Sequence, residues 1–390
     1  MKNNSNTLSI LIPDGETTLL SNVVHSLSLV RNIKIYVLSS HKKKYFKYSI
    51  DNNCLKHSRF IERFIYYKSS TPEYWIEKID ETVEAFNIDL IMPIFDVSTS
   101  KILKYKSLLK NESKLCNLTD VGNYETALRK DLLYKFLKSN NLSCPESIII
   151  DTKSNYEVEN LSFPLVAKPT FGFNGGMGVR FIKSKKELLE YLDVNKTNDP
   201  ILLQKFIEGF DVTCNVLCKN GDIQAYTMQK AALVKSVKVT PQHEFSFFND
   251  DALLRLMKDL MKALKWSGVA NIDFRFDKED NTYKVIEINP RFWLNTEASA
   301  LVGVNFPYLY CLSTLNQKFE FTPVKTGAFL HLKALVKRFQ RNPFLIFRIS
   351  YLYTNTPIRF IIKDPFVLWC KFMWRTNNII SSKILKKKTS

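Results

Sequence analysis

Three oxygen-bearing side chains lie in two consecutive strand-like segments, NIDFRFD and VIEINPR. They are Asp273, Glu287 and Asn289. Residues two apart share a face of a strand, so pairing of the two strands about the turn DKEDNT brings all three together. Carboxylate and amide oxygens are the ligands that Mg²⁺ takes alongside phosphates and water. An edge hairpin with one polar face in water would carry the same residues, so both interpretations stay open on this pattern alone.

A glycine-rich loop, FGFNGGMGV, follows Lys168 and separates two further strand-like runs, FPLVAKPT and VRFIKS. It includes Gly175, Gly176 and Gly178 in a chain that has only 11 glycines. Glycine reaches positive φ, and successive exposed N–H groups form a concave anion site. The loop therefore suggests a cover over phosphates, although a simple hairpin loop has the same composition. It matches neither GxxxxGK[ST] nor GxGxxG, both of which open a helix.

The segment QKFIEGFD suggests a cleft for a nucleotide base. Phe206 and Ile207 supply apolar walls, the strand backbone supplies donors and acceptors, and Asp211 can accept from ribose hydroxyls. Lys130, at the start of a helical pattern, and Lys168 can both lie against phosphates. Each feature is weak alone because most lysines are solvated, but their combination describes a metal–nucleotide site.

The elements that position these residues alternate between strand and helix signals in the first third of the chain. LSILIP, IKIYVLSS and DLIMPIFD are strand-like, and TTLLSNVVHSLSLV and TPEYWIEKIDETVEAFN are helix-like, the latter with Thr71 as N-cap and Pro72 at its first position. This order predicts a doubly wound parallel sheet.

The middle of the chain changes to an antiparallel pattern. NYETALRKDLLYKFLKSNNLSCPES is expected to hold one helix followed by a loop, and DDALLRLMKDLMKALKW is an amphipathic helix. An Asn-Gly turn at 220–221 predicts a hairpin. We expect an α/β domain at 1–120, an α+β domain at 121–320 with a lid subdomain at about 160–215, and a basic helical segment at 321–390.

The order of these motifs resembles that of the ATP-grasp superfamily, from about residue 8 to 320. The matching segments are RKDLLYKFL, PLVAKPTFGFNGGMGV, LLQKFIEGFDVT, NIDFRFD and VIEINPRF, of which VIEINPR is the most specific. The resemblance is to the carboxylate–amine ligase type, which includes D-alanine–D-alanine ligase and the ATP-grasp domains of biotin carboxylase and carbamoyl phosphate synthetase. The N-terminal third resembles the α/β domain that usually precedes this fold.

The resemblance implies a role for each matching residue. Lys130 and Lys168 correspond to the phosphate-binding lysines, Lys168 being also catalytic, and Gly175, Gly176 and Gly178 to the lid. The adenine- and ribose-binding residues would be Gln204, Lys205, Phe206, Ile207 and Asp211. Relatives commonly have Glu at the position of Gln204 or of Asp211. Asp273, Glu287 and Asn289 correspond to the magnesium ligands, and Arg291 to the arginine that steadies the transferred phosphate or the tetrahedral intermediate.

The activity that the resemblance implies is an ATP-dependent carboxylate–amine, or carboxylate–thiol, ligase that forms an acyl phosphate and releases ADP and phosphate. ATP and two Mg²⁺ ions, with Mn²⁺ as a substitute, would be the cofactors, and a small carboxylate and an amine the partners. The alternatives are another phosphoryl-transfer or carboxylating reaction, and a non-catalytic ATP-binding regulator. Nucleic acid is not expected as a partner, and the sequence leaves the oligomeric state open.

Composition and charge limit where the protein works. The net charge is +18 and the sequence pI is about 9.4, which suggests anionic partners. Seven scattered cysteines without CxxC, and no signal-peptide or membrane-spanning stretch, predict a cytoplasmic protein.

The last part of the chain is basic and rich in aromatic residues. From Lys325 onward Asp364 is the only acidic residue, and cations interleave with PFLIFRISYLY, IRFII and FVLWCKFMW. This pattern predicts peripheral attachment to an anionic surface at the inner face of the membrane. Packing of the segment on the ATP-grasp core, or binding of a polyanion, are the alternatives.

Overall fold

The computed structural model describes residues 7–40, 51–68, 70–151, 161–171, 178–195, 199–231, 244–370 and 373. The chain forms two compact units. Unit 1 comprises Met1–Asn117, Arg291–Phe319 and Phe329–Ser390, and unit 2 comprises Leu118–Pro290 and Glu320–Ala328. In sequence, unit 2 is therefore inserted into unit 1.

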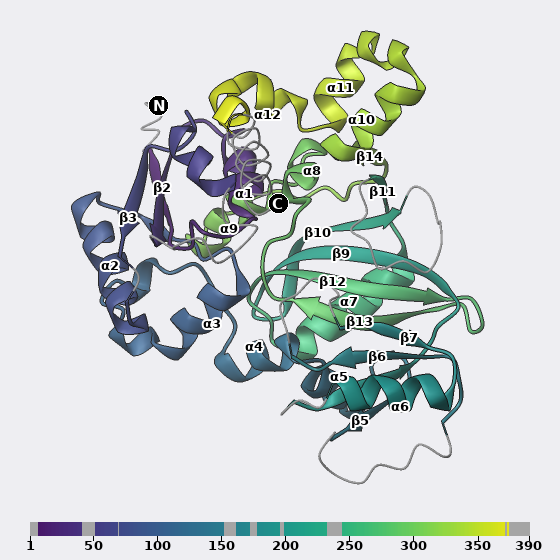
Figure 1. Cartoon of the computed structure of the whole chain (residues 1–390). Helices are drawn as coiled ribbons and strands as arrows, with labels where there is room; N and C mark the ends of the chain where they lie inside the picture. The colour runs from purple at the N-terminus through teal and green to yellow at the C-terminus, as the bar shows by residue number, and fades with distance from the viewer. Residues whose placement is uncertain are drawn as a thin grey trace, which may run out of the picture. The chain divides into compact units, whose positions relative to one another are not determined.

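Unit 1 is built on a parallel sheet with strand order β3-β2-β1-β4 (Figure 1). Its strands are β1 (Leu8–Ile12), β2 (Ile33–Ser40), β3 (Arg63–Tyr67) and β4 (Leu90–Ile91). The apolar residues of β1 and β2 are almost all buried because helices pack on the sheet, as expected for parallel strands. The helices are α1 (Leu20–Leu27), α2 (Pro72–Ala85) and α3 (Asp96–Lys104), with 3₁₀ turns at Asp51–His57, Lys106–Leu108 and Glu112–Lys114.

Helical segments from the C-terminal part of the chain complete unit 1. They are α8 (Thr296–Leu301), α9 (Phe306–Thr314), α10 (Leu332–Arg341), a 3₁₀ turn η4 (Pro343–Phe347), α11 (Ile349–Asn355) and α12 (Ile358–Lys363). The region from α10 to α12 has its own small core, formed by Leu330, Leu335, Leu345 and Leu352.

Unit 2 contains a large sheet with strand order β13-β12-β9-β10-β11-β14 (Figure 1). The strands are β9 (Gly209–Lys219), β10 (Asp222–Ala231), β11 (Glu244–Phe248), β12 (Gly268–Asp277), β13 (Thr282–Asn289) and β14 (Gly327–Leu330), at which the two units meet along the chain. The strands from β13 to β11 pair antiparallel. Asn220 and Gly221, between β9 and β10, both have positive φ, as the Asn-Gly signal predicts.

A second, four-stranded sheet of unit 2 has the order β5-β8-β6-β7. Its strands are β5 (Ser147–Ile150), β6 (Leu165–Pro169), β7 (Arg180–Ile182) and β8 (Ile201–Lys205), all paired antiparallel. Helix α6 (Lys185–Val194) contributes Leu188, Tyr191 and Leu192 to the core below it. The remaining helices are α4 (Val121–Leu128), α5 (Lys130–Ser139) and α7 (Asp251–Ala263).

The predicted fold class is confirmed: a parallel α/β sheet is followed by antiparallel sheets. The prediction of one helix in NYETALRKDLLYKFLK is wrong. The structure has two helices, because Arg129 adopts an extended conformation and the N–H of Lys130 bonds to the carbonyl of Thr170. The division of the chain at 120 and 320 stays a prediction.

Candidate active site

The hairpin of β12 and β13 places two carboxylates opposite each other in unit 2. Asp273 and Glu287 are cross-strand partners, and the register shifts directly after Asp273. Thr213, on the neighbouring strand β9, donates a hydrogen bond of 2.8 Å to Asp273. Burial, reinforced by the charge of Glu287, raises the pKa of Asp273 to about 7. The pair therefore resists carrying two negative charges unless a cation lies beside it.

Two lysines face this carboxylate pair from other elements. The Nζ of Lys130, at the first residue of α5, lies 3.3 Å from the Oε2 of Glu287. Lys168 lies in β6 and is buried, and its ammonium donates a 2.7 Å hydrogen bond to Gln204. Burial raises the pKa of Glu287, but the positive charges of Lys130 and Lys168 outweigh that effect and hold it below its usual value.

The ammonium of Lys168 is in an unfavourable position for a positive charge. Burial lowers its pKa to about 8, and the nearby Lys130 lowers it further while Glu287 partly compensates. Its hydrogen-bond acceptor, Gln204, lies in β8 and is itself buried, and donates to the hydroxyl of Ser147 at 3.3 Å. A buried cation with one neutral acceptor is suited to receive an anionic group.

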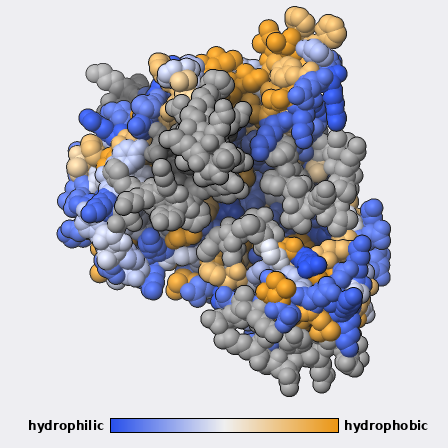
Figure 2. All heavy atoms as spheres, viewed as in Figure 1, coloured by the Kyte–Doolittle hydropathy of each residue, from blue (hydrophilic) through white to orange (hydrophobic). Residues whose placement is uncertain are grey.

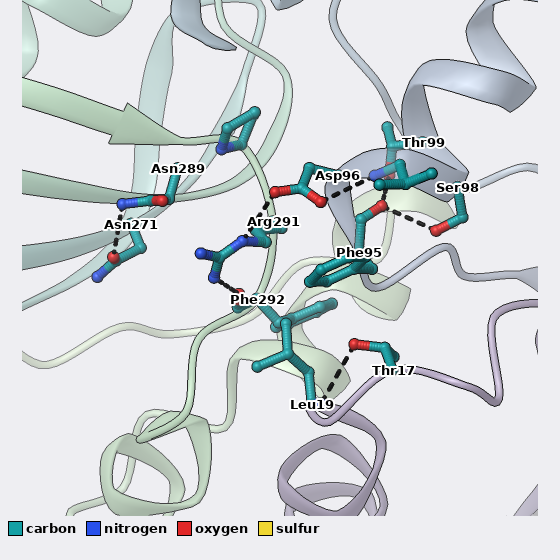
Figure 3. A network of polar contacts seen from close by, with 12 residues as sticks. Thr17, Leu19, Phe95, Asp96, Ser98, Thr99, Asn271, Asn289, Arg291 and Phe292 are labelled. Atoms are coloured by element: carbon teal, nitrogen blue, oxygen red, sulfur yellow. Dashed lines mark hydrogen bonds and ion pairs between the residues drawn. The ribbon is translucent and has the colours of Figure 1, made fainter. Parts of the chain in front are cut away.

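A row of amides fixes the third predicted metal ligand. Asn289 donates to Asn271 at 3.4 Å, Asn271 to Asn215 at 2.8 Å, and Asn215 to Thr227 at 3.0 Å, so the row crosses β13, β12, β9 and β10. Figure 3 shows the bond between Asn289 and Asn271. Asn289 also lies 3.5 Å from Glu287, so its amide is held beside the carboxylate pair.

The hinge between β8 and β9 is held by Arg275, a residue that the sequence interpretation missed. Its guanidinium donates to the carbonyl of Ile207 at 2.6 Å and to that of Gly209 at 3.3 Å, and pairs with Asp211 at 2.6 Å. It also lies over the ring of Phe206, 5.2 Å from the centroid. Arg275 comes two residues after Asp273, and the two-residue period of a strand could have placed it on the same face as that predicted metal ligand.

The remaining predicted nucleotide-binding residues have separate positions. Lys205 ends β8 and is exposed, with its ammonium 3.5 Å from Glu279. Gly178 has a φ of 82° and its carbonyl accepts a 2.7 Å hydrogen bond from Tyr191. Gly175 and Gly176 lie outside the described residues.

Arg291, the predicted catalytic arginine, belongs to unit 1. Its Nε donates to Asp96 at 3.1 Å, and its guanidinium lies 5.8 Å from the ring centroid of Phe95 (Figure 3). Burial raises the pKa of Asp96, and the charge of Arg291 opposes that rise. The structure thus brings Lys130, Lys168, Gln204, Asp273, Glu287 and Asn289 together within unit 2.

Comparison with known proteins agrees with this geometry. Residues 127–294 match the family model described as "ATP-grasp domain". The chain therefore carries an ATP-grasp domain, as its sequence motifs predict.

Among curated relatives, the carbamoyl phosphate synthase large chain of Methanobrevibacter smithii is 24% identical over 249 residues, which is 58% of this chain and 22% of the relative. That of Agathobacter rectalis is 29% identical over 140 residues, 34% of this chain and 13% of the relative. The chain thus spans less than a quarter of the length of these relatives.

Among solved structures, the L-amino acid ligase of Bacillus licheniformis has a TM-score of 0.60 and 20% identity, with 84% of this chain and 80% of that chain covered. The N5-carboxyaminoimidazole synthetase of Staphylococcus aureus complexed with ADP has a TM-score of 0.64 and 17% identity, with 87% of both chains covered. These likenesses confirm the fold.

Proposed function

We propose that this protein is an ATP-dependent ligase that joins a small carboxylate to an amine, or to a thiol, through an acyl phosphate. The observation that carries the proposal is the cluster of Lys130, Lys168, Asp273 and Glu287 in unit 2. It combines buried positive charge for phosphates with paired carboxylates for a cation. Structural relatives include an amino acid ligase and a synthetase complexed with ADP, which supports the choice of reaction class.

The donors around the carboxylate pair fit magnesium. Asp273, Glu287 and Asn289 offer oxygen atoms on adjacent strands. Asp273 and Glu287 are cross-strand partners, and the burial that raises the pKa of Asp273 to about 7 is a cost that a bound cation would offset. We propose that these three residues hold two Mg²⁺ ions, with Mn²⁺ able to replace them. When bound, the ions would neutralise the charge that builds up between the phosphates during transfer.

The nucleotide is proposed to lie along the hinge and the lysines. Gln204, Lys205, Phe206 and Ile207 would bind the adenine, and Asp211 the ribose. Arg275 holds the carbonyl groups of this hinge in fixed positions, so it acts as a positioning residue. Lys130 and Lys168 would bind the phosphates, which the loop containing Gly175, Gly176 and Gly178 would cover.

In the proposed reaction, a carboxylate oxygen attacks the γ-phosphorus of ATP and the bond to the ADP oxygen breaks. Lys168 stabilises the charge on the transferred phosphoryl group, since this transfer needs positioning and neutralisation more than a covalent side chain. The position of Arg291 in the motif VIEINPR assigns the same role to Arg291. The amine or thiol then attacks the acyl carbon, the carbon–oxygen bond to phosphate breaks, and the nucleophile loses a proton to solvent. The products are an amide or thioester, ADP and phosphate.

A carboxylating reaction, or phosphoryl transfer without ligation, would use the same cluster, and the nature of the product separates them from the ligase. A non-catalytic regulator would bind Mg·ATP with the same carboxylates, and ATP binding without release of ADP would separate it from the ligase. We propose that the reaction takes place in the cytoplasm, where ATP is available, at the inner face of the membrane.

The test is a panel of carboxylates and amines scored for release of ADP and phosphate, with mass spectrometry of the product. Hydroxylamine should trap the acyl phosphate as a hydroxamate. Glu287→Gln should abolish product formation and leave the circular dichroism spectrum unchanged, whereas Glu279→Gln, at an exposed carboxylate near the hinge, should retain it. Release of AMP and pyrophosphate, or full activity of Glu287→Gln, would overturn the proposal.

A further inference from the structure

Two sets of apolar residues in the segment from Leu332 to Trp369 differ sharply in exposure. One set is buried and explained by folding: Leu335, Leu345, Leu352 and Phe360 are at most 8% exposed. Phe360 stacks on His25 with ring centroids 4.6 Å apart, and Asp364 accepts a hydrogen bond from Ser58, so Phe360 and Asp364 attach the segment to the rest of unit 1.

The second set of apolar side chains lies in solvent. Phe344, Ile346, Phe347 and Ile349 are between 59% and 77% exposed, although they are consecutive or nearly so in the chain. Phe366 and Trp369 are 69% and 62% exposed. Figure 2 shows orange atoms gathered where Figure 1 places α10 and α11. We call these six side chains the outer apolar face. The rings of Phe344 and Phe347 lie 6.5 Å apart between centroids. Single exposed apolar residues are ordinary, but several within one short segment mark an interaction surface.

The cations of the same segment are exposed beside this face. They are Lys333, Lys337, Arg338, Arg341, Arg348 and Lys363. The only acid of the segment, Asp364, is buried and bonded to Ser58, so it does not offset them at the surface. The segment therefore presents aromatic and aliphatic side chains interleaved with positive charge.

We propose that the outer apolar face docks on an anionic lipid membrane. Aromatic and aliphatic side chains enter the boundary between headgroups and acyl chains, and Lys and Arg contact anionic headgroups. No helix among the described residues is long and apolar enough to cross a bilayer, so the contact is with the surface. The proposal does not depend on the reaction proposed above.

Charge distinguishes the membrane from the other occupants. A second copy of this chain, related by two-fold symmetry, would bring the same cations against each other, which is unfavourable without acids between them. A nucleic acid would match the cations and could stack bases on Phe344 and Phe347, but it would leave the aliphatic side chains of Ile346 and Ile349 without a partner. An anionic bilayer satisfies both the charges and the apolar side chains.

The test is co-sedimentation of the full chain with vesicles of phosphatidylcholine containing roughly a third phosphatidylglycerol, a content chosen to give strong anionic attraction. Binding should be strong to these vesicles and weak to pure phosphatidylcholine. The double variant Phe344→Ser/Phe347→Ser should lower the partition coefficient by about ten-fold or more, because two buried rings are lost from the lipid. Val194→Ser, at an apolar residue of α6 that is 81% exposed, should change it by less than about two-fold.

The charge contribution is tested separately. Lys337→Gln/Arg341→Gln should lower the partition coefficient by about ten-fold or more, whereas Lys186→Gln/Lys258→Gln, at exposed lysines of α6 and α7, should have a much smaller effect. Because all these side chains are exposed, the variants should unfold at the same temperature as the wild type. An equal fall in the partition coefficient for the two double variants would show that binding follows net charge alone, and it would overturn the proposal that the outer apolar face binds the membrane.

A fluorescence measurement reports whether the face enters lipid. Trp75, Trp266 and Trp293 are at most 4% exposed, whereas Trp369 is 62% exposed. Binding to vesicles should shift the emission to the blue, and Trp369→Phe should reduce the shift while preserving sedimentation. Bound protein without a blue shift, concentration-dependent self-association that is lost in Phe344→Ser/Phe347→Ser, or tighter binding to DNA than to the vesicles would each overturn the proposal.

Discussion

Replacing Lys168 by methionine should separate the stability of unit 2 from its activity. The side chain is 7% exposed, and among the residues that the structure describes its ammonium has one hydrogen-bond acceptor, Gln204. Burial lowers its pKa from 10.5 to about 8, so the folded state disfavours the charged lysine. Methionine is similar in length and carries no charge. We therefore expect the variant to remain folded while it loses ATP-dependent turnover.

The size of the effect on stability follows from the two pKa values. A group whose pKa is lowered on folding destabilises the folded protein below the folded pKa, and the loss disappears as the pH rises through the unfolded pKa. With the pKa lowered from 10.5 to about 8, the wild type should lose about 3 kcal/mol from this group at pH 8 but only about 1 kcal/mol at pH 10. The difference in the free energy of unfolding between the variant and the wild type should therefore shrink by about 2 kcal/mol.

Urea unfolding of both proteins at pH 8 and pH 10, followed by tryptophan fluorescence, measures this difference, because groups distant from Lys168 titrate equally in the two proteins. At pH 8 the variant should be at least as stable as the wild type, since removal of the buried charge offsets the lost bond to Gln204. A difference that stays constant between the two pH values within about 0.5 kcal/mol, the usual error of such comparisons, would refute this reasoning. So would retention of ATP turnover by Lys168→Met.

Three further substitutions test other parts of unit 2. Gly209→Ala should lower the free energy of unfolding in urea by about 3 kcal/mol, because its Cβ would lie 1.7 Å from a main-chain oxygen of β12. The control Gly122→Ala, whose Cβ would lie 3.4 Å from the nearest atom, should have no such effect. Equal effects of the two substitutions would contradict the close approach at Gly209. Arg275→Gln should raise the KM for ATP by about ten-fold with a smaller change in kcat, since it releases the hinge carbonyls; an unchanged KM would remove its positioning role. Asp250→Ala should destabilise the protein by about 1 kcal/mol in thermal unfolding, because the carboxylate of Asp250 caps α7 by accepting from two backbone N–H groups. Asp251→Ala, the matched control, should have a smaller effect. Similar losses of stability in both variants would argue against the cap.

The sequence predicts the elements whose signals are local. The apolar runs of β1, β2 and β4 and the cap at Thr71 follow from periodicity and capping rules, and all are present. The opposition of Asp273 and Glu287 follows from the two-residue period and a short polar turn. The chemical roles assigned to these residues stay predictions.

The parts that could not be predicted depend on contacts distant in sequence. Arg275 holds Asp211, 64 residues away, and the alternation of polar and apolar residues in β12 does not identify a partner. The break between α4 and α5 arises because Lys130 bonds to the carbonyl of Thr170, so tertiary structure overrides a continuous helical pattern. The short strand β5 is too brief to give a periodic signal.

The division of unit 1 into three stretches of the chain has a consequence for synthesis on the ribosome. The N-terminal residues of unit 1 emerge first, but some of their contacts form only with residues that emerge last. His25 stacks on Phe360, and Ser58 donates a hydrogen bond to Asp364. All but nine residues of unit 2 are translated as one uninterrupted stretch between them. The ATP-grasp domain can thus complete its core while the nascent N-terminal sheet still lacks its final helices, and a chaperone that protects this protein would act on the sheet that was made first.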